Sequence, residues 1–131
     1  MDPRALDDIA RRHGILLLLQ FGSTVSGRAR ADSDLDLAVL LEHEPRSLTD
    51  YADLIGDLQR LTPDREVDIA LLNTADPLLL KKIVETATLL YGPARRLYEF
   101  KMYAFKRYQD HRRYLALERD YVASRLRRAA R

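Results

Sequence analysis

The stretch FGSTVSGRARADSDLDLAVLL, residues 21–41, decides the fold. It joins the end of one apolar run, residues 15–21, to a second run, residues 34–41, through a loop rich in Gly, Ser and Arg. Each run has the length of a strand, and the continuous apolar run 15–21 fits a strand that is buried on both faces of a sheet. Asp34 and Asp36 stand at the start of the second run, and two carboxylates at the edge of an apolar segment need a physical explanation.

The two carboxylates share one face of the predicted strand. Residues two apart in a strand point the same way, so Asp34 and Asp36 face together while the leucines beside them turn into the core. Like charges at this spacing repel, and partial burial raises the cost. A divalent cation is the simplest group that offsets the repulsion. Mg²⁺ binds one or two carboxylates together with substrate phosphates.

A third carboxylate has a similar setting. Asp68 lies in the apolar segment 67–72, which predicts a third strand. If this strand neighbours residues 34–41, Asp68 completes a triad with the first two carboxylates. Such a triad can hold two Mg²⁺ ions ~4 Å apart for an in-line displacement at phosphorus. Asp68 would then act as the base or would orient it.

The loop before the carboxylates has the composition of a phosphate site. Gly22 follows a buried strand, where glycine allows a sharp turn and a close approach to a ligand. Backbone N–H groups in such a turn bind anions, and the Ser23 hydroxyl can donate to a phosphate oxygen. Arg28 and Arg30 add positive charge, and Gly27 adds freedom to the loop backbone. We therefore expect Gly22, Ser23, Arg28 and Arg30 to hold nucleotide phosphates.

The rest of the chain predicts helices around a small sheet. Asp-Pro pairs open helices at residues 2–13 and 76–91, because Asp is a good N-cap and Pro suits the first turn. Apolar spacing predicts another helix over residues 50–61. No Gly or Pro occurs between residues 95 and 128, where apolar residues recur at helical spacing, so one long amphipathic helix, or two with a bend, is expected. The fold class is α/β or α+β, with residues 1–94 as the catalytic domain and residues 95–131 as a helical extension of the same unit.

The composition narrows the possible classes of protein further. The 131 residues suit one domain, and the absence of cysteine excludes disulfides and thiolate metal sites. No apolar run reaches the ~18 residues of a membrane span, and no basic-then-apolar signal is seen, so we expect a cytoplasmic protein without a membrane partner. Residues 95–131 carry 12 Lys and Arg against 4 Asp and Glu, whereas residues 1–94 carry 10 against 16. A basic extension on an acidic body can indicate an anionic partner.

The motif resembles that of a known superfamily. Gly22-Ser23, ten residues, and Asp34-Leu35-Asp36 form the GS-x10-DxD pattern of the DNA polymerase β-type nucleotidyltransferases. The text GSTVSGRARADSDLDLAVL is similar to the minimal nucleotidyltransferases (MNT) that serve as antitoxins beside HEPN-domain toxins. The resemblance covers roughly residues 5–115. It implies a polymerase β-like domain with a small mixed sheet flanked by helices, followed by a long C-terminal helix.

The resemblance also implies an activity. Such antitoxins are similar to enzymes that transfer AMP from ATP to a tyrosine of the partner HEPN toxin, an RNase, and thereby silence it. Carried over by position, Gly22 and Ser23 would bind phosphate, Asp34 and Asp36 would bind metal, and Asp68 would be the third ligand and the base. This chain departs from many relatives at Ser26, where they carry Arg. Arg28 or Arg30 could supply that phosphate contact.

Other readings stay open at this point. Asp34 and Asp36 could be solvated residues of an exposed strand, Asp68 could pair with Arg65 or Lys81, and the loop residues could serve only the turn. The chain could also neutralise a toxin by occlusion, or transfer a nucleotide to a small molecule such as an aminoglycoside. Basic residues interleaved with aromatics in the last helix could indicate RNA binding. An apolar stripe with a cationic outer face explains that helix more simply, and a protein partner would cover the stripe.

Overall fold

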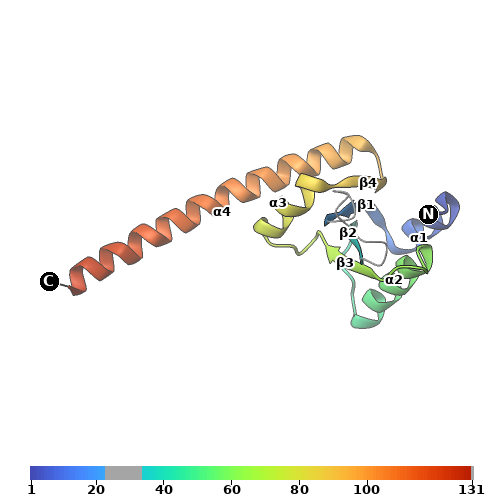
Figure 1. Ribbon diagram of the computed structural model, residues 1–131, viewed down its shortest axis with the longest axis horizontal. Helices are drawn as coiled ribbons and strands as arrows, with labels where there is room; N and C mark the ends of the chain where they lie inside the picture. Colours follow the sequence, from blue (N-terminus) through green and yellow to red (C-terminus); the bar gives the residue numbers. More distant parts are fainter. Residues whose placement is uncertain (23–33, 131) are drawn as a thin grey trace.

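The computed structural model describes residues 1–22 and 34–130, and in them a four-stranded sheet lies between two pairs of helices (Figure 1). The expected α/β architecture, with a small mixed sheet and a long C-terminal helix, is confirmed. Ser23, Ser26, Arg28 and Arg30 lie outside the described residues. In chain order the elements are α1 (Pro3–His13), β1 (Ile15–Phe21), β2 (Leu35–Leu41), α2 (Leu48–Leu61), β3 (Val67–Leu71), α3 (Pro77–Thr86), β4 (Thr88–Tyr91) and α4 (Ala94–Ala129).

The sheet has the strand order β3-β2-β1-β4. β1 runs antiparallel to both of its neighbours, whereas β2 and β3 are parallel. The N-terminal ends of β2 and β3 therefore meet the C-terminal end of β1 at one edge of the sheet. The chain passes from β1 to β2 at this edge, so the motif loop begins and ends there.

Local signals define the helix ends. The Asp2 side chain accepts a hydrogen bond from the Arg4 amide at 3.1 Å, and Gly14 ends α1 in the left-handed region with φ 66°. Asp76 caps α3 in the same way as Asp2 caps α1, through the Leu79 amide at 2.9 Å. Both Asp-Pro predictions are thus confirmed.

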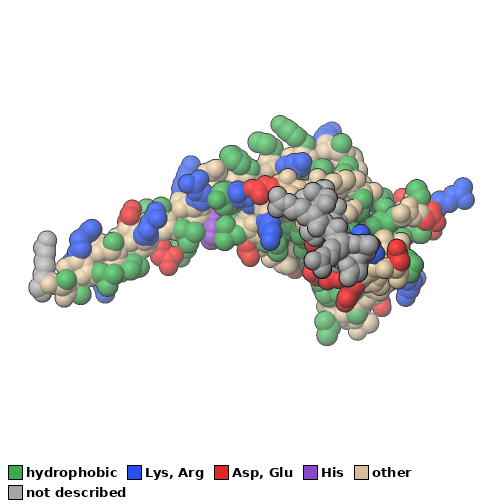
Figure 2. Space-filling model, in the orientation of Figure 1, with side chains coloured by type: hydrophobic (Ala, Val, Ile, Leu, Met, Phe, Trp, Pro, Cys, Tyr) green, Lys and Arg blue, Asp and Glu red, His purple; other side chains and the backbone are tan. Residues whose placement is uncertain are grey.

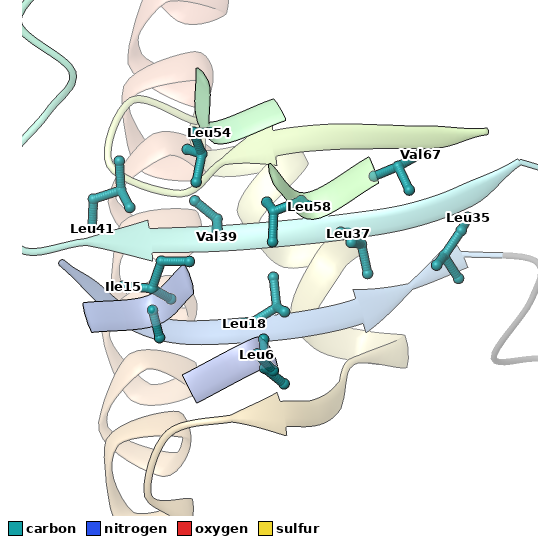
Figure 3. Close-up of a cluster of buried hydrophobic side chains, with 11 residues drawn as sticks. Leu6, Ile15, Leu18, Leu35, Leu37, Val39, Leu41, Leu54, Leu58 and Val67 are labelled. Carbon is teal, nitrogen blue, oxygen red and sulfur yellow. The ribbon is translucent and has the colours of Figure 1, made fainter. Parts of the chain in front are cut away.

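Two hydrophobic clusters fix the layers. On one face of the sheet, Leu6 of α1 and Leu54 and Leu58 of α2 pack against strand residues such as Leu18 and Leu37 (Figure 3). On the other face, α3 and the first turns of α4 cover the sheet. The buried members of this second cluster are Leu17, Leu19, Ala38, Leu72, Leu80, Ile83, Phe100 and Ala104. The central strands β1 and β2 are largely buried on both faces, as the continuous apolar run of residues 15–21 predicts for β1.

The prediction that the third helix runs to residue 91 is wrong. α3 ends at Thr86, Ala87 is extended with φ −66° and ψ 133°, and residues 88–91 form β4. β4 pairs with β1, with Leu19 opposite Leu89 and Gln20 opposite Thr88. Pairing with β1 satisfies backbone groups along a strand edge that would otherwise be open, and this tertiary gain outweighs the helical spacing of the leucines.

The C-terminal helix is a single element of 36 residues, about 54 Å long at 1.5 Å per residue. Phe100 and Ala104 are buried against the body, and α4 then continues well beyond it (Figure 1). Apolar side chains on the projecting part stay exposed, among them Leu115 (46%), Val122 (47%) and Leu126 (66%). Among the described residues, no helix has both the length and the apolar character that crossing a bilayer requires. The division of the chain after residue 94 stays a prediction.

Candidate active site

The parallel pairing of β2 and β3 brings the carboxylates together. Asp36 and Asp68 are register partners, and Asp34 lies two residues before Asp36. Register partners on adjacent strands share a face, so all three carboxylates belong to the face that α3 and α4 cover. The next residues along that face, Ala38 and Ala70, already belong to the second hydrophobic cluster. The carboxylates therefore lie where the apolar layer ends.

Gly22 faces Asp36 from the neighbouring strand. Phe21, the last residue of β1, is the register partner of Asp36, and Gly22 follows it with φ +81°. A Cβ atom built on Gly22 would lie only 3.2 Å from Cγ of Asp36 and would overlap its carboxylate oxygen. Both the left-handed backbone and this close approach require glycine. The first residue of the motif thus gives the Asp36 carboxylate its space.

Thr86 holds the start of the motif loop in place. The Gly22 amide donates a hydrogen bond to Oγ1 of Thr86 at 3.2 Å. Thr86 is the last residue of α3, 64 positions further along the chain. The C-terminal end of α3 therefore lies at the same edge of the sheet as the three carboxylates.

The electrostatics of the site centre on Asp36. Burial raises the pKa of its carboxyl above the ordinary value, and the charges of Asp68 and Asp34 raise that pKa further. The positive charge of Lys82 acts in the opposite direction and lowers it. Asp36 is half-buried, whereas Asp34 and Asp68 are exposed. A site with this imbalance of charge favours a cation.

The donor set fits a hard divalent cation such as Mg²⁺. It consists of carboxylate oxygens, it carries mutual repulsion that a cation relieves, and Gly22 gives the Asp36 carboxylate the room that a side chain would take. In the present arrangement of side chains, no three His, Cys, Asp or Glu groups of the described residues lie close enough to hold one ion. The strand register, rather than a closed set of ligands, places the three carboxylates together.

The structure brings four of the predicted site residues to one edge: Gly22, Asp34, Asp36 and Asp68. Ser23, Arg28 and Arg30 fall outside the described residues. Lys81, which the sequence offered as an alternative partner of Asp68, forms an ion pair with Glu85 at 2.7 Å. The roles of the predicted site residues in catalysis and binding stay predictions.

Lys82 and Thr86 are not among the site residues that the sequence predicts. Both lie on α3, one turn apart, and α3 packs over the face that carries the carboxylates. Their four-residue spacing was visible in the sequence, but it indicates a shared helix face and not what that face meets. The contact of Thr86 with Gly22 depends on the whole sheet being assembled.

A mixed sheet with helices on both faces thus presents three carboxylates at one end of two neighbouring strands, an arrangement that suits the binding of a metal ion together with phosphates. Residues 5–96 match the family described as polymerase beta nucleotidyltransferases. The chain belongs to this family and is a nucleotidyltransferase.

Solved structures share the fold over nearly the whole chain. One chain of a toxin–antitoxin complex with AMP-PNP superposes with a TM-score of 0.70 at 23% identity, covering 96% of this chain and 98% of that chain. A chain from the complex of tri-AMPylated Shewanella oneidensis HEPN toxin with MNT antitoxin gives a TM-score of 0.63 at 22% identity, covering 94% of this chain and 93% of that chain.

A shorter structure has higher identity. It carries the provisional description of a minimal nucleotidyltransferase, is 37% identical, and superposes with a TM-score of 0.55 over 66% of this chain and 87% of its own. No curated protein matches the chain. The similarity beyond residue 96 thus comes from the toxin–antitoxin complexes, whose matched chains align over 94–96% of this one.

Proposed function

We propose that this chain is an MNT antitoxin that transfers AMP from ATP to a tyrosine hydroxyl of a HEPN-type RNase toxin and thereby silences it. The observation that carries the proposal is the register of Asp36 with Asp68, with Asp34 on the same face and Gly22 against Asp36. The fold shared with chains of toxin–antitoxin complexes, one of them with AMP-PNP and one with an AMPylated toxin, supports the substrate and the partner.

The reaction is an in-line displacement at the α-phosphorus of ATP. The tyrosine oxygen forms the new bond to phosphorus, the bond to the bridging oxygen of the β-phosphate breaks, and pyrophosphate leaves with that electron pair. The tyrosine proton passes to a base, and Asp68 is the carboxylate we assign to this role. Asp68 is exposed at the edge of the site, where an incoming protein can reach it.

Asp34, Asp36 and Asp68 are the residues that would hold Mg²⁺, as two ions when the nucleotide is bound. When bound, the metal lowers the pKa of the attacking hydroxyl and neutralises the charge on the leaving pyrophosphate. The chain's own contribution is to hold three carboxylates on one rigid edge of a sheet. Gly22 gives the Asp36 carboxylate its room, and Thr86 holds the Gly22 backbone through a hydrogen bond.

The projecting half of α4 supplies a surface for the protein acceptor. Phe100 and Ala104 lie on one stripe of the helix and pack against the body of the domain. Leu115, Val122 and Leu126 continue that stripe, and no described residue covers them. An enzyme whose substrate is a protein needs such a surface to hold the acceptor hydroxyl in place. Figure 2 shows green apolar and blue basic side chains along this part of the helix.

The experiment co-expresses this chain with the protein of the neighbouring reading frame, which the proposal expects to be of HEPN type, and measures the intact mass of that protein. The wild-type chain is compared with the Asp34→Ala, Asp36→Ala double variant. Gains of whole AMP units only with the wild-type chain establish the transfer, and peptide mapping then locates the tyrosine. A tight complex without any mass gain in either case overturns the proposal and favours neutralisation by occlusion.

A further inference from the structure

Two adjacent lysines of α3 have different surroundings. Lys81 Nζ lies 2.7 Å from Oε1 of Glu85 and 4.8 Å from the ring centroid of Tyr108 in α4. Lys81 therefore forms an ion pair within α3 and a cation–π contact with α4. Lys82 forms no ion pair with any acidic side chain of the described residues, and its side chain is exposed.

Lys82 lies on the other flank of the helix, on the side of the carboxylates. Consecutive residues of a helix are about 100° apart, and residues at i and i+4 share a face. Lys82 therefore shares its face with Thr86, which accepts the hydrogen bond from Gly22. Gly22 in turn contacts the Asp36 carboxylate. Lys82 therefore lies one helical turn from Thr86, the residue that bonds the first residue of the motif.

We propose that Lys82 binds the phosphates of the nucleotide from the α3 side of the site. This inference rests on the proposed function, because it concerns the nucleotide of the same reaction. The polyphosphate of ATP is an anion that three carboxylates repel, so a cation on the α3 side of the site lowers the free energy of the bound state. An ammonium on a flexible stem provides a point charge for a phosphate.

The chain offers a matched control for this role. Lys82→Gln removes the charge on the side of the carboxylates, and Lys81→Gln removes the same charge one position earlier, on the side of α4. Lys82→Arg keeps the charge and tests whether charge alone suffices. Thermal melting of all three variants shows whether each is folded before any binding is measured.

The first readout is the dissociation constant of ATP, and the second is the KM for ATP beside kcat. We expect Lys82→Gln to weaken ATP binding and raise KM about tenfold, the loss of one charge-assisted phosphate contact. We expect Lys82→Arg to recover most of this loss, and Lys81→Gln to bind ATP as the wild-type chain does. Binding of adenosine, which has no phosphate, should not change in any variant.

The outcomes separate this inference from the proposed function. If the wild-type chain transfers AMP and the two glutamine variants bind ATP equally well, Lys82 has no role and the proposed function stands. If the wild-type chain binds ATP without transferring AMP to the neighbouring protein, the proposed acceptor is wrong, and the comparison of ATP binding still decides the role of Lys82. If the wild-type chain binds no ATP, both are overturned.

Discussion

Asp36 of β2 and Asp68 of β3 are direct register partners in a parallel pair of strands, at the end where both strands begin. Their charges act on one another, and that of Asp68 is the strongest charge effect on the pKa of Asp36. A fold selected only for stability has no need of two opposed carboxylates on one sheet face. The two carboxylates therefore repel one another, and a bound cation relieves this repulsion. At Asp36 the charge that metal binding requires lowers the stability of the metal-free fold.

Replacing Asp36 by Asn should raise the melting temperature at pH 7 while it abolishes AMP transfer. Burial and neighbouring carboxylates raise the pKa of Asp36 in the folded state, so the folded state binds its proton more tightly than the unfolded state does. Stability from this group is thus present in acid and is lost as pH rises through the folded pKa. The advantage of the Asn variant should shrink below about pH 4, where the wild-type carboxyl is protonated in both states. Asp64→Asn, in an exposed turn, is the control, and equal melting temperatures of wild-type chain and Asp36→Asn at pH 7 would contradict the prediction.

Addition of Mg²⁺ and nucleotide should reverse the order of the melting temperatures of the wild-type chain and Asp36→Asn. A ligand that binds only the folded state stabilises it by RT ln(1 + [L]/Kd), about 2.7 kcal/mol at a hundredfold excess over Kd. Mg²⁺ with a non-hydrolysable ATP analogue should therefore raise the melting temperature of the wild-type chain and leave that of Asp36→Asn nearly unchanged. Chelation by EDTA should return the wild-type value. The same upward shift in both proteins would show that Asp36 is not a metal ligand.

The sequence predicted the parts of this site that are local and missed those that depend on assembly. The alternation of Asp34 and Asp36 fixes their common face, and the second Asp-Pro pair fixes the start of α3 at Pro77. The adjacency of Asp68 was predicted only on the condition that the third strand lies beside the second. The end of α3 could not be predicted, because residues 88–91 leave the helix to complete the edge of β1, and that edge exists only once the chain has folded.

Gly22→Ala should both destabilise the protein and impair the site. Alanine at φ +81° is strained, and its Cβ would overlap the Asp36 carboxylate. We expect a loss of about 1–3 kcal/mol in the free energy of unfolding, from backbone strain and overpacking together. Chemical denaturation measures it. Gly56→Ala is the matched control. Gly56 lies inside α2, and among the described residues the nearest atom to an added Cβ is Nη2 of Arg60 at 4.0 Å. Alanine there should stabilise the helix by about 0.5–1 kcal/mol.

Asp57 of α2 is the centre of a second group of charged side chains, away from the candidate active site. Its buried carboxylate accepts a hydrogen bond from His13 at 2.6 Å and from Arg12 at 3.2 Å, and it pairs with Arg60. The hydrogen bond from His13 is the main cause that lowers the pKa of Asp57, with Arg12 adding to it against the effect of burial. This carboxylate therefore fastens α2 to the end of α1.

Asp57→Asn should cost about 2 kcal/mol at pH 7, the scale of hydrogen bonds to a charged group. Because the folded pKa lies below the ordinary value of 3.8, the stabilisation is present above about pH 4 and is lost as pH falls through the folded pKa. The difference between the two proteins should accordingly shrink in acid. Denaturation curves at pH 7 and pH 3 measure this. Asp53→Asn, at an exposed position of the same helix, should change stability by less than about 0.5 kcal/mol at either pH.

The projecting stripe of α4 should matter for the partner and not for folding. Val122 and Leu126 are 47% and 66% exposed, so replacing both by Ser removes little buried surface from the isolated chain. We expect the free energy of unfolding to change by less than about 0.5 kcal/mol per residue, and the affinity for the HEPN-type partner to fall at least about tenfold. Arg113→Ser is the control, because nine residues at about 100° each place Arg113 opposite Val122 on the helix. If calorimetric titration gives the Val122/Leu126 variant the affinity of the control, the stripe is not the contact surface, and the partner must bind the body of the domain.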